Sequence, residues 1–263
     1  MKLEVDQLSF AYHQEPVLRN ISFSADSGQI IALLGSNGVG KSTLFRCLLG
    51  FLKIQSGQIL LNKQNIDSFS QSELSKEIAY IPQSYSPTFN YTVEDSVLMG
   101  LTGQLRITEN PGSSQLQLVH KTLQDLGIEH LAKRGSRQIS GGERQLMLLA
   151  RALVQNAGLL LMDEPTASLD YGNSCKVMER IQQLGKAGYS VIFSTHDPNQ
   201  AFRYANRVLA MHNGTLLADG TPQQVLSETL LSSLYGIPVA VCRVNVAGEI
   251  YPVCLPMKNL SEQ

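Results

Sequence analysis

The stretch GSNGVGKST, at residues 35–43, has the residue types and the spacing that bind the phosphates of a nucleotide. It fits the pattern G-x-x-x-x-G-K-[ST], in which glycines let backbone N–H groups point inward at phosphate oxygens. Lys41 would neutralise the β- and γ-phosphates, and Ser42 would ligate Mg²⁺. An expected strand precedes the stretch and an expected helix follows it, and the N-terminus of a helix favours an anion. The predicted nucleotide-binding residues are Gly35, Ser36, Asn37, Gly38, Val39, Gly40, Lys41, Ser42 and Thr43.

Two adjacent carboxylates follow an apolar run in GLLLMDEP, at residues 158–165. Asp163 is placed to hold the Mg²⁺ shell. Glu164 lies one residue further along and can point at an attacking water. A strand that ends in Asp-Glu is a weak signal alone, since polar strand ends are common. After a phosphate-binding loop in the same chain, it becomes a strong one.

The segment ISGGERQLMLLARAL, at residues 139–153, predicts a helix that begins with an unusual pair of glycines. Ser140 and Glu143 have the spacing of a capping box, in which each side chain bonds to the backbone N–H of the other residue. The box does not explain Gly141 and Gly142, because glycine lowers helix propensity by about 1 kcal/mol relative to alanine. We infer that something must approach this helix end closely.

Together these motifs resemble the nucleotide-binding subunit of ATP-binding-cassette (ABC) transporters, and the resemblance covers nearly the whole chain. The marks of the family occur in order and form a highly specific set. They are Tyr12 as the aromatic that stacks on adenine, the P-loop at residues 35–43, Gln83 as the Q-loop, ISGGE at residues 139–143 as the signature, Asp163 and Glu164 as the Walker B end, SLD at residues 168–170 as the D-loop, and His196 at the end of STH. Ile139 stands where leucine is usual and Glu143 where glutamine is frequent, and the family tolerates both.

Four of these marks have a plainer interpretation when each is taken alone. Tyr12 could be a packing residue and Gln83 a solvated loop residue. His196 could be a hydrogen-bonded histidine at a strand end, and Asp170 could be a helix N-cap. Their order and spacing relative to the P-loop favour the functional interpretation.

The resemblance implies that two chains face each other head to tail, with ATP and Mg²⁺ between the P-loop of one and the signature of the other. The residues expected to meet the nucleotide from the signature side are Ser140, Gly141, Gly142, Glu143 and Asp170. Side chains at the two glycines would hold the γ-phosphate away from the helix N-terminus. Glu164 is then the general base, His196 contacts the γ-phosphate, and Gln83 senses Mg²⁺ or water. Hydrolysis would open the dimer.

Composition and charge disfavour several other classes of protein. A net charge of −1 gives no electrostatic case for binding nucleic acid. No apolar run approaches the roughly 20 residues of a membrane helix, and the N-terminus MKLEVDQLSF lacks the apolar core of a secretion signal. The four cysteines show neither metal-ligand nor disulfide spacing, which is typical of reduced thiols in a cytosolic protein.

Strand and helix patterns alternate along much of the chain, with apolar strands such as GQIIALLG at residues 28–35. This alternation predicts a mostly parallel sheet flanked by helices. Residues 84–157 suit helices instead, with a loop at residues 102–114 and one buried stripe. The stripe consists of Leu146, Leu149, Ala150 and Leu153.

With the family resemblance, these patterns predict the fold class and the domains. The class is α/β: a P-loop NTPase (RecA-like) core with an antiparallel β subdomain and an inserted α-helical subdomain. We expect an ABC ATPase domain at residues 1–221, with the helical subdomain at about 84–157 inserted in it. A short extension of helices and a hairpin should follow at residues 222–263.

The resemblance also implies a separate membrane permease. Family members receive a cytoplasmic helix of the membrane subunit just after the Q-loop, which here is the segment Ser84–Gly100. Its apolar and aromatic residues suit a groove, although ordinary helix packing explains the last three. They are Tyr85, Phe89, Tyr91, Val93, Val97 and Leu98.

The chain lacks fused membrane spans and the long tail of sugar importers, so the resemblance points to an importer of iron–siderophore, haem or cobalamin. Import of zinc, manganese or molybdate is an alternative, and so is a soluble ABC ATPase without a transport role. A non-hydrolysing module would need a broken Lys41, Glu164 or His196, and all three are intact. The expected location is peripheral, at the cytoplasmic face of the cell membrane, where the chain serves a substrate-binding protein indirectly.

Overall fold

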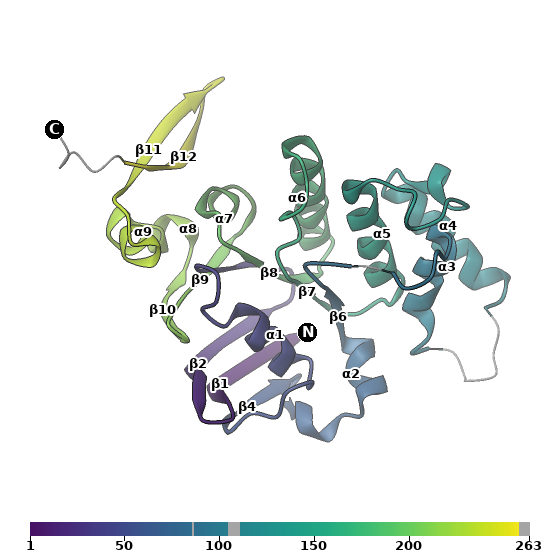
Figure 1. Ribbon diagram of the computed structural model, residues 1–263, viewed down its shortest axis with the longest axis horizontal. Helices are drawn as coiled ribbons and strands as arrows, with labels where there is room; N and C mark the ends of the chain where they lie inside the picture. Colours follow the sequence, from purple (N-terminus) through teal and green to yellow (C-terminus); the bar gives the residue numbers. More distant parts are fainter. Residues whose placement is uncertain (86, 105–110, 258–263) are drawn as a thin grey trace.

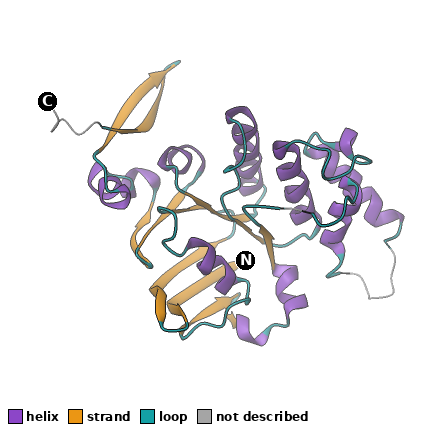
Figure 2. Cartoon of the chain, viewed as in Figure 1, coloured by secondary structure: helices purple, strands orange, loops and turns teal. Residues whose placement is uncertain are grey.

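Two β-sheets that differ in strand direction form the centre of the molecule (Figures 1 and 2). The computed structural model describes residues 1–85, 87–104 and 111–257. The larger sheet has the strand order β10-β9-β3-β8-β7-β6, and all its neighbouring pairs are parallel except β9 and β10. Its strands are β3 (Ile30–Leu34), β6 (Ile78–Ile81), β7 (Leu159–Met162), β8 (Ser190–Thr195), β9 (Arg207–His212) and β10 (Thr215–Gly220). Every residue of β3, β7 and β8 is buried, which explains the unbroken apolar runs in the sequence.

The smaller sheet is antiparallel, with the strand order β2-β1-β4-β5. Its strands are β1 (Lys2–Tyr12), β2 (Glu15–Asp26), β4 (Ser56–Leu61) and β5 (Gln64–Asn65). One hydrophobic core joins this sheet and α1 (Lys41–Leu48) to one face of the larger sheet, where Leu3, Phe45 and Ile31 are fully buried. The smaller sheet therefore holds α1, and with it the end of the P-loop, against the parallel strands.

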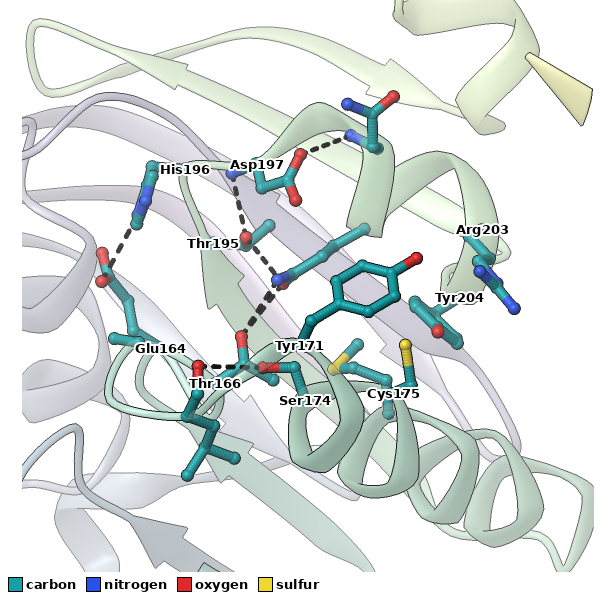
Figure 3. A pocket seen from close by; sticks show the side chains of 15 residues that line it. Glu164, Thr166, Tyr171, Ser174, Cys175, Thr195, His196, Asp197, Arg203 and Tyr204 are labelled. Atoms are coloured by element: carbon teal, nitrogen blue, oxygen red, sulfur yellow. Dashed lines mark hydrogen bonds and ion pairs between the residues drawn. The ribbon is translucent and has the colours of Figure 1, made fainter. Parts of the chain in front are cut away.

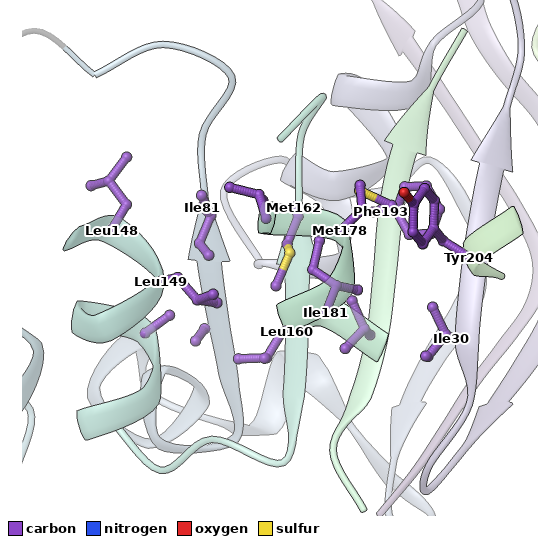
Figure 4. Close-up of a cluster of buried hydrophobic side chains, with 14 of the residues drawn as sticks. Ile30, Ile81, Leu148, Leu149, Leu160, Met162, Met178, Ile181, Phe193 and Tyr204 are labelled. Carbon is purple, nitrogen blue, oxygen red and sulfur yellow. The ribbon is translucent and has the colours of Figure 1, made fainter. Parts of the chain in front are cut away.

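The opposite face of the larger sheet packs against helices (Figure 4). Leu149 of α5, Ile181 of α6 and Phe193 of β8 lie in this second core. The remaining helices are α2 (Gln71–Glu77), α3 (Val93–Leu98), α4 (Ser113–Asp125), α5 (Gly141–Val154), α6 (Tyr171–Lys186), α7 (Pro198–Tyr204), α8 (Pro222–Val225) and α9 (Glu228–Tyr235). Short 3₁₀ turns occur at Ile66–Ser68, Met99–Leu101 and Glu129–Leu131. The predicted α/β class is confirmed, with its antiparallel sheet and its group of helices between β6 and β7.

Two local predictions need correction. The buried surface of α5 is wider than the predicted stripe, because α5 packs against α3 and α4 as well as β6. Leu146 and Leu153 are only half-buried, whereas Met147 and Leu148 are buried. The predicted loop at residues 102–114 lies in part outside the described residues, and its last two residues already belong to α4.

The C-terminal part of the described chain consists of α8, α9 and a hairpin of β11 (Val239–Val246) and β12 (Glu249–Pro256). The hairpin projects away from the two sheets, and its base contacts α7 (Figure 1). None of the helices in residues 1–85, 87–104 and 111–257 is both long enough and apolar enough to cross a bilayer.

Candidate functional site

The P-loop connects β3 to α1 and depends on glycine at its last turn. Gly40 has a φ of +106° and is the N-cap of α1. A Cβ at Gly40 would lie 3.0 Å from Leu18 Cδ2 and 3.2 Å from the Val17 carbonyl oxygen. Gly38 has a φ of +82° and faces open space. The turn thus combines a left-handed backbone with close packing on one side and room on the other.

Lys41 is buried within this loop, with 6% of its surface exposed. Its ammonium donates to the carbonyl oxygens of Gly35 at 2.6 Å and Ser36 at 3.0 Å. The same nitrogen lies 3.8 Å from Glu164 Oε1. Burial lowers the pKa of Lys41, and the carboxylates of Glu164 and Asp163 oppose that shift. Two carbonyl oxygens and one carboxylate oxygen thus offset the cost of burying the Lys41 ammonium, which could turn toward phosphate oxygens.

A hollow of about 300 Å³ opens beside the loop. Its lining consists of Val17, Asn37, Gly38, Gly40, Lys41, Ser42, Thr43, Gln83 and Glu164. The small residues, the hydroxyls and the lysine fit the phosphates of a nucleotide with a divalent cation. The structure does not place Tyr12 in this lining. Tyr12 ends β1 with 38% exposure, and its ring lies edge-on to Phe10 at 4.9 Å between centroids.

Asp163 and Glu164 follow β7, and both residues bond to Ser194 on the neighbouring strand β8. The Ser194 hydroxyl donates to Asp163 Oδ1 at 2.6 Å and accepts from the backbone N–H of Glu164 at 2.8 Å. Asp163 is only 4% exposed. Burial and the nearby Asp163 carboxylate raise the pKa of Tyr80 to about 12. Ser194 thus links the Asp163 side chain to the Glu164 main chain, a contact that the motif analysis missed.

The carboxylate of Glu164 is the point where the predicted residues converge. It accepts a hydrogen bond from Gln83 Nε2 at 3.1 Å, and it lies 3.4 Å from His196 Nδ1 (Figure 3). Glu164 has a φ of +43°, a conformation that costs a non-glycine residue about 1–3 kcal/mol and is common at functional sites. Its side chain is 10% exposed, whereas that of His196 is 53% exposed. A carboxylate beside a phosphate-binding loop, with an amide and an imidazole in contact, can take a proton from water during phosphoryl transfer.

The predicted capping box at the start of α5 is confirmed. The backbone N–H of Ser140 donates to Glu143 Oε2 at 2.7 Å, and that of Glu143 donates to Ser140 Oγ at 3.3 Å. The hydrogen bond from the Ser140 backbone N–H lowers the pKa of the Glu143 carboxyl. Asp170 is confirmed as the N-cap of α6, where its carboxylate accepts from the backbone N–H of Asn173 at 2.9 Å. The interpretation of Asp170 as a helix N-cap is therefore correct for its role within this chain.

The two glycines of α5 have different surroundings, which corrects the single explanation offered for both. A Cβ at Gly142 would lie 2.6 Å from Asn173 Cγ and 2.9 Å from Asn173 Cβ, so contact within this chain already requires glycine there. Gly141 is exposed, and its Cβ would meet only Ser168 O at 3.5 Å and Leu169 Cδ2 at 3.6 Å. The local packing leaves room for a side chain at Gly141.

The structure brings some predicted residues together and leaves others apart. The P-loop, Gln83, Glu164 and His196 form one group around the Glu164 carboxylate. In the part of the chain that the structure describes, the lining of the phosphate hollow does not include residues 140–143 or Asp170. Glu164 and His196 also border a second hollow of about 420 Å³, between α6 and α7 (Figure 3). The group formed by residues 140–143 is thus separate from the P-loop within one chain.

Known proteins resemble this chain over most of its length. The profile of a family described as ABC transporter matches residues 18–167. The hemin import ATP-binding protein HmuV of Shewanella denitrificans is 39% identical over 89% of this chain and 92% of that protein. The molybdate import ATP-binding protein MolC of Haemophilus influenzae is 36% identical over 90% of this chain and 89% of that protein. A solved chain, from an inward-facing conformation of a metal-chelate type ABC transporter, is 32% identical with a TM-score of 0.88, over 97% of each chain.

Proposed function

Because this chain belongs to the ABC transporter family and is one of its ATP-hydrolysing subunits, we propose that it powers import of a metal chelate through a separate membrane permease. The proposed cargo class is iron–siderophore, haem or cobalamin, and a hemin import protein among its relatives supports it. The observation that carries the catalytic assignment is the contact of Glu164 with Lys41, Gln83 and His196 beside the P-loop. Import of molybdate, zinc or manganese is the alternative, and the similarity to a molybdate import protein is consistent with it.

Co-purification with the permease tests this function directly. ATP hydrolysis would be measured with and without the permease and substrate-binding protein, in the presence of each cargo. Stimulation by haem, an iron–siderophore or cobalamin is the expected result. If only molybdate, zinc or manganese stimulated ATP hydrolysis, the alternative cargo class would replace the proposed one. If the chain hydrolysed ATP at its full rate and the permease did not change that rate, a soluble ATPase without a transport role would be favoured.

Each residue of the site has a proposed task in hydrolysis. The backbone of residues 35–43 holds the phosphates, and Lys41 turns from its carbonyl partners to the β- and γ-phosphates. Ser42 and Asp163, with Gln83, are the residues that would hold Mg²⁺, which supplies charge neutralisation on the phosphates when bound. Glu164 takes the proton of the attacking water, and His196 orients that carboxylate and contacts the γ-phosphate. Tyr12 stacks on the adenine.

We propose that a second copy of this chain completes the site. Ser140, Gly141 and Asp170 are exposed, and they do not line the phosphate hollow of their own chain. The N-terminus of α5 offers free N–H groups, which bind anions. A head-to-tail dimer would place this helix end, with Glu143 nearby, against the γ-phosphate held by the P-loop of the partner. ATP would then link the two copies, and hydrolysis would release them.

The two glycines of α5 provide a matched pair of variants for this dimer. Gly142→Ala should destabilise the fold by about 1–3 kcal/mol through overpacking against Asn173, offset in part by the gain in helix propensity. Gly141→Ala should leave the melting temperature unchanged or slightly higher, because its Cβ meets only ordinary contacts. It should nevertheless lower ATP turnover by about ten-fold, the cost of one weakened hydrogen bond to a charged phosphate. Thermal unfolding and steady-state hydrolysis separate the two effects, and normal turnover in Gly141→Ala would argue against the shared site.

The segment Ser84–Gly100 is the proposed docking site for the permease, and its structure narrows the residues involved. Ser86 lies outside the described residues. Val93 and Val97 are fully buried and Leu98 packs on the core, so the packing interpretation holds for these three. Phe89 and Tyr91 are 64% and 42% exposed, and their rings contact each other. These two aromatics therefore remain for a partner. Tyr85, in the same segment, helps to line a hollow of about 320 Å³.

The docking segment is also tied to the start of α5. The Arg137 guanidinium donates to the carbonyl oxygens of Pro87 at 2.7 Å and Thr88 at 2.6 Å. Arg137 lies just before the capping residue Ser140. A movement of the docking segment can therefore be transmitted to the N-terminus of α5, which we propose binds the nucleotide held by the second copy.

Phe89→Asp should lower transport by at least about ten-fold, since an exposed aromatic anchor is typical of interface hot spots. Basal ATP hydrolysis should stay within about two-fold, because Phe89 does not line the phosphate hollow. Uptake in reconstituted vesicles and hydrolysis by the isolated subunit are the two measurements. Ile250→Asp is the matched control, as Ile250 is also 64% exposed but lies on the distant hairpin. Unimpaired uptake in Phe89→Asp would refute the docking assignment.

The proposed location follows from the permease: the chain binds peripherally at the cytoplasmic face of the cell membrane. A substrate-binding protein on the other side would act on it only indirectly. Partition of the chain between membrane and supernatant, with and without the permease, measures this.

A further inference from the structure

Helix α9, near the C-terminus, contacts the segment that carries His196. The Tyr235 hydroxyl donates a hydrogen bond of 2.9 Å to the main-chain carbonyl oxygen of His196. Burial raises the pKa of the Tyr235 phenol above its usual range, so the hydroxyl keeps the proton that it donates. The bond engages only the backbone of His196, whose imidazole stays half-exposed and faces Glu164.

A second contact ties the same turn to the C-terminal hairpin. The Asn199 carboxamide accepts from the backbone N–H of Cys254 at 2.8 Å and donates to the carbonyl oxygen of Cys254 at 3.2 Å. Asn199 lies in the first turn of α7, where the Asp197 carboxylate accepts its backbone N–H at 2.8 Å. The turn from β8 into α7 is thus held at two points by residues from the last part of the described chain.

These contacts matter because His196 lies on a turn rather than within a strand. The buried strand β8 ends at Thr195, and the helix α7 begins at Pro198. The imidazole Nδ1 is 3.4 Å from Glu164 Oε2, so a small shift of the turn would change that contact. Functional side chains need positioning within about 0.5 Å, which a turn alone does not provide.

We propose that Tyr235 is a positioning residue for ATP hydrolysis, which holds the main chain of His196 so that the imidazole meets Glu164. Asn199 and Cys254 hold the other end of the same turn. Tyr235 of α9 and Cys254 of the hairpin thereby support the hydrolytic site, although neither lines the phosphate hollow. This inference rests on the proposed role of His196 in hydrolysis.

Tyr235→Phe removes one hydroxyl and keeps the ring. In the whole chain, turnover of ATP should fall by about three- to ten-fold, the usual worth of one hydrogen bond. The KM for ATP should stay within about two-fold, because the contacts of the P-loop with the phosphates are unchanged. The matched control is Tyr251→Phe, since within the described residues the Tyr251 hydroxyl donates its hydrogen bond only to Glu249 on the same hairpin. The control should hydrolyse ATP at the normal rate.

A double-mutant cycle with His196→Ala distinguishes the possible outcomes. If Tyr235 acts through His196, Tyr235→Phe will slow the wild type and cause no further loss in the His196→Ala background. An equal loss in both backgrounds, or normal turnover in Tyr235→Phe, would overturn the positioning role. Normal turnover in His196→Ala itself would instead refute the role proposed for His196, on which this inference depends.

Discussion

Replacing Glu164 with glutamine should lower the rate of ATP hydrolysis by about 10²- to 10⁴-fold, because an amide cannot accept the proton of the attacking water. The change keeps the length of the side chain and its place after β7. The backbone N–H of residue 164 should still donate to Ser194 Oγ, as it does at 2.8 Å in the native chain. ATP should therefore still bind, and two copies should stay closed around unhydrolysed nucleotide. Phosphate release and size-exclusion chromatography with ATP and Mg²⁺ measure the two effects.

Glu179→Gln is the matched control for this experiment. Glu179 is exposed on α6 and does not line the phosphate hollow, so its variant should hydrolyse ATP normally and stay open. If Glu164→Gln released phosphate at the native rate, another group would have to be the base. If it were inactive but never formed a stable dimer with ATP, the shared site would be wrong while the base assignment held.

Local patterns predicted the parallel strands and the P-loop helix well, since each depends on residues close in sequence. The apolar run that contains β3 is buried along its whole length, as expected for a strand covered on both faces. The width of the buried surface on α5 could not be predicted from one helix, because α3 and α4 cover a second side of it. The contact of the hairpin with α7 joins Asn199 to Cys254, which are far apart in sequence. The domain limits at residues 84, 157 and 221 stay predictions.

The candidate site shows the same division between local and long-range information. The motif at residues 35–43 and the Asp163–Glu164 pair are encoded by spacing alone. Ser194 bonds to the Asp163 carboxylate and to the Glu164 backbone N–H only because β7 pairs in parallel with β8, with Met162 opposite Phe193. The strand order would have revealed it, since the ends of neighbouring parallel strands meet. The reason for Gly142 also lies in another element, because Asn173 of α6 packs against it.

Lys41→Met should weaken ATP binding by about 30-fold or more, since truncating one partner of a buried charge pair costs at least about 2 kcal/mol. The Lys41 ammonium is the cation that the P-loop itself supplies, and it is held by two carbonyl oxygens at 2.6 and 3.0 Å. Methionine keeps an apolar stem of similar length, so packing around the buried stem should change little. Without the ammonium, the Glu164 carboxylate also loses a cation 3.8 Å away and would repel the γ-phosphate.

The stabilisation that ATP gives to the fold reports this loss without any need for turnover. A ligand that binds only the folded state stabilises it by RT ln(1 + [L]/Kd), so a roughly 30-fold loss of affinity should remove up to about 2 kcal/mol of that stabilisation and reduce the ATP-induced shift in melting temperature in Lys41→Met. Lys53→Met is the matched control, because Lys53 is exposed and lies after α1, outside the lining of the hollow. It should keep the full shift. A full shift in Lys41→Met would mean that backbone N–H groups alone hold the phosphates, with Lys41 acting only on the rate of hydrolysis.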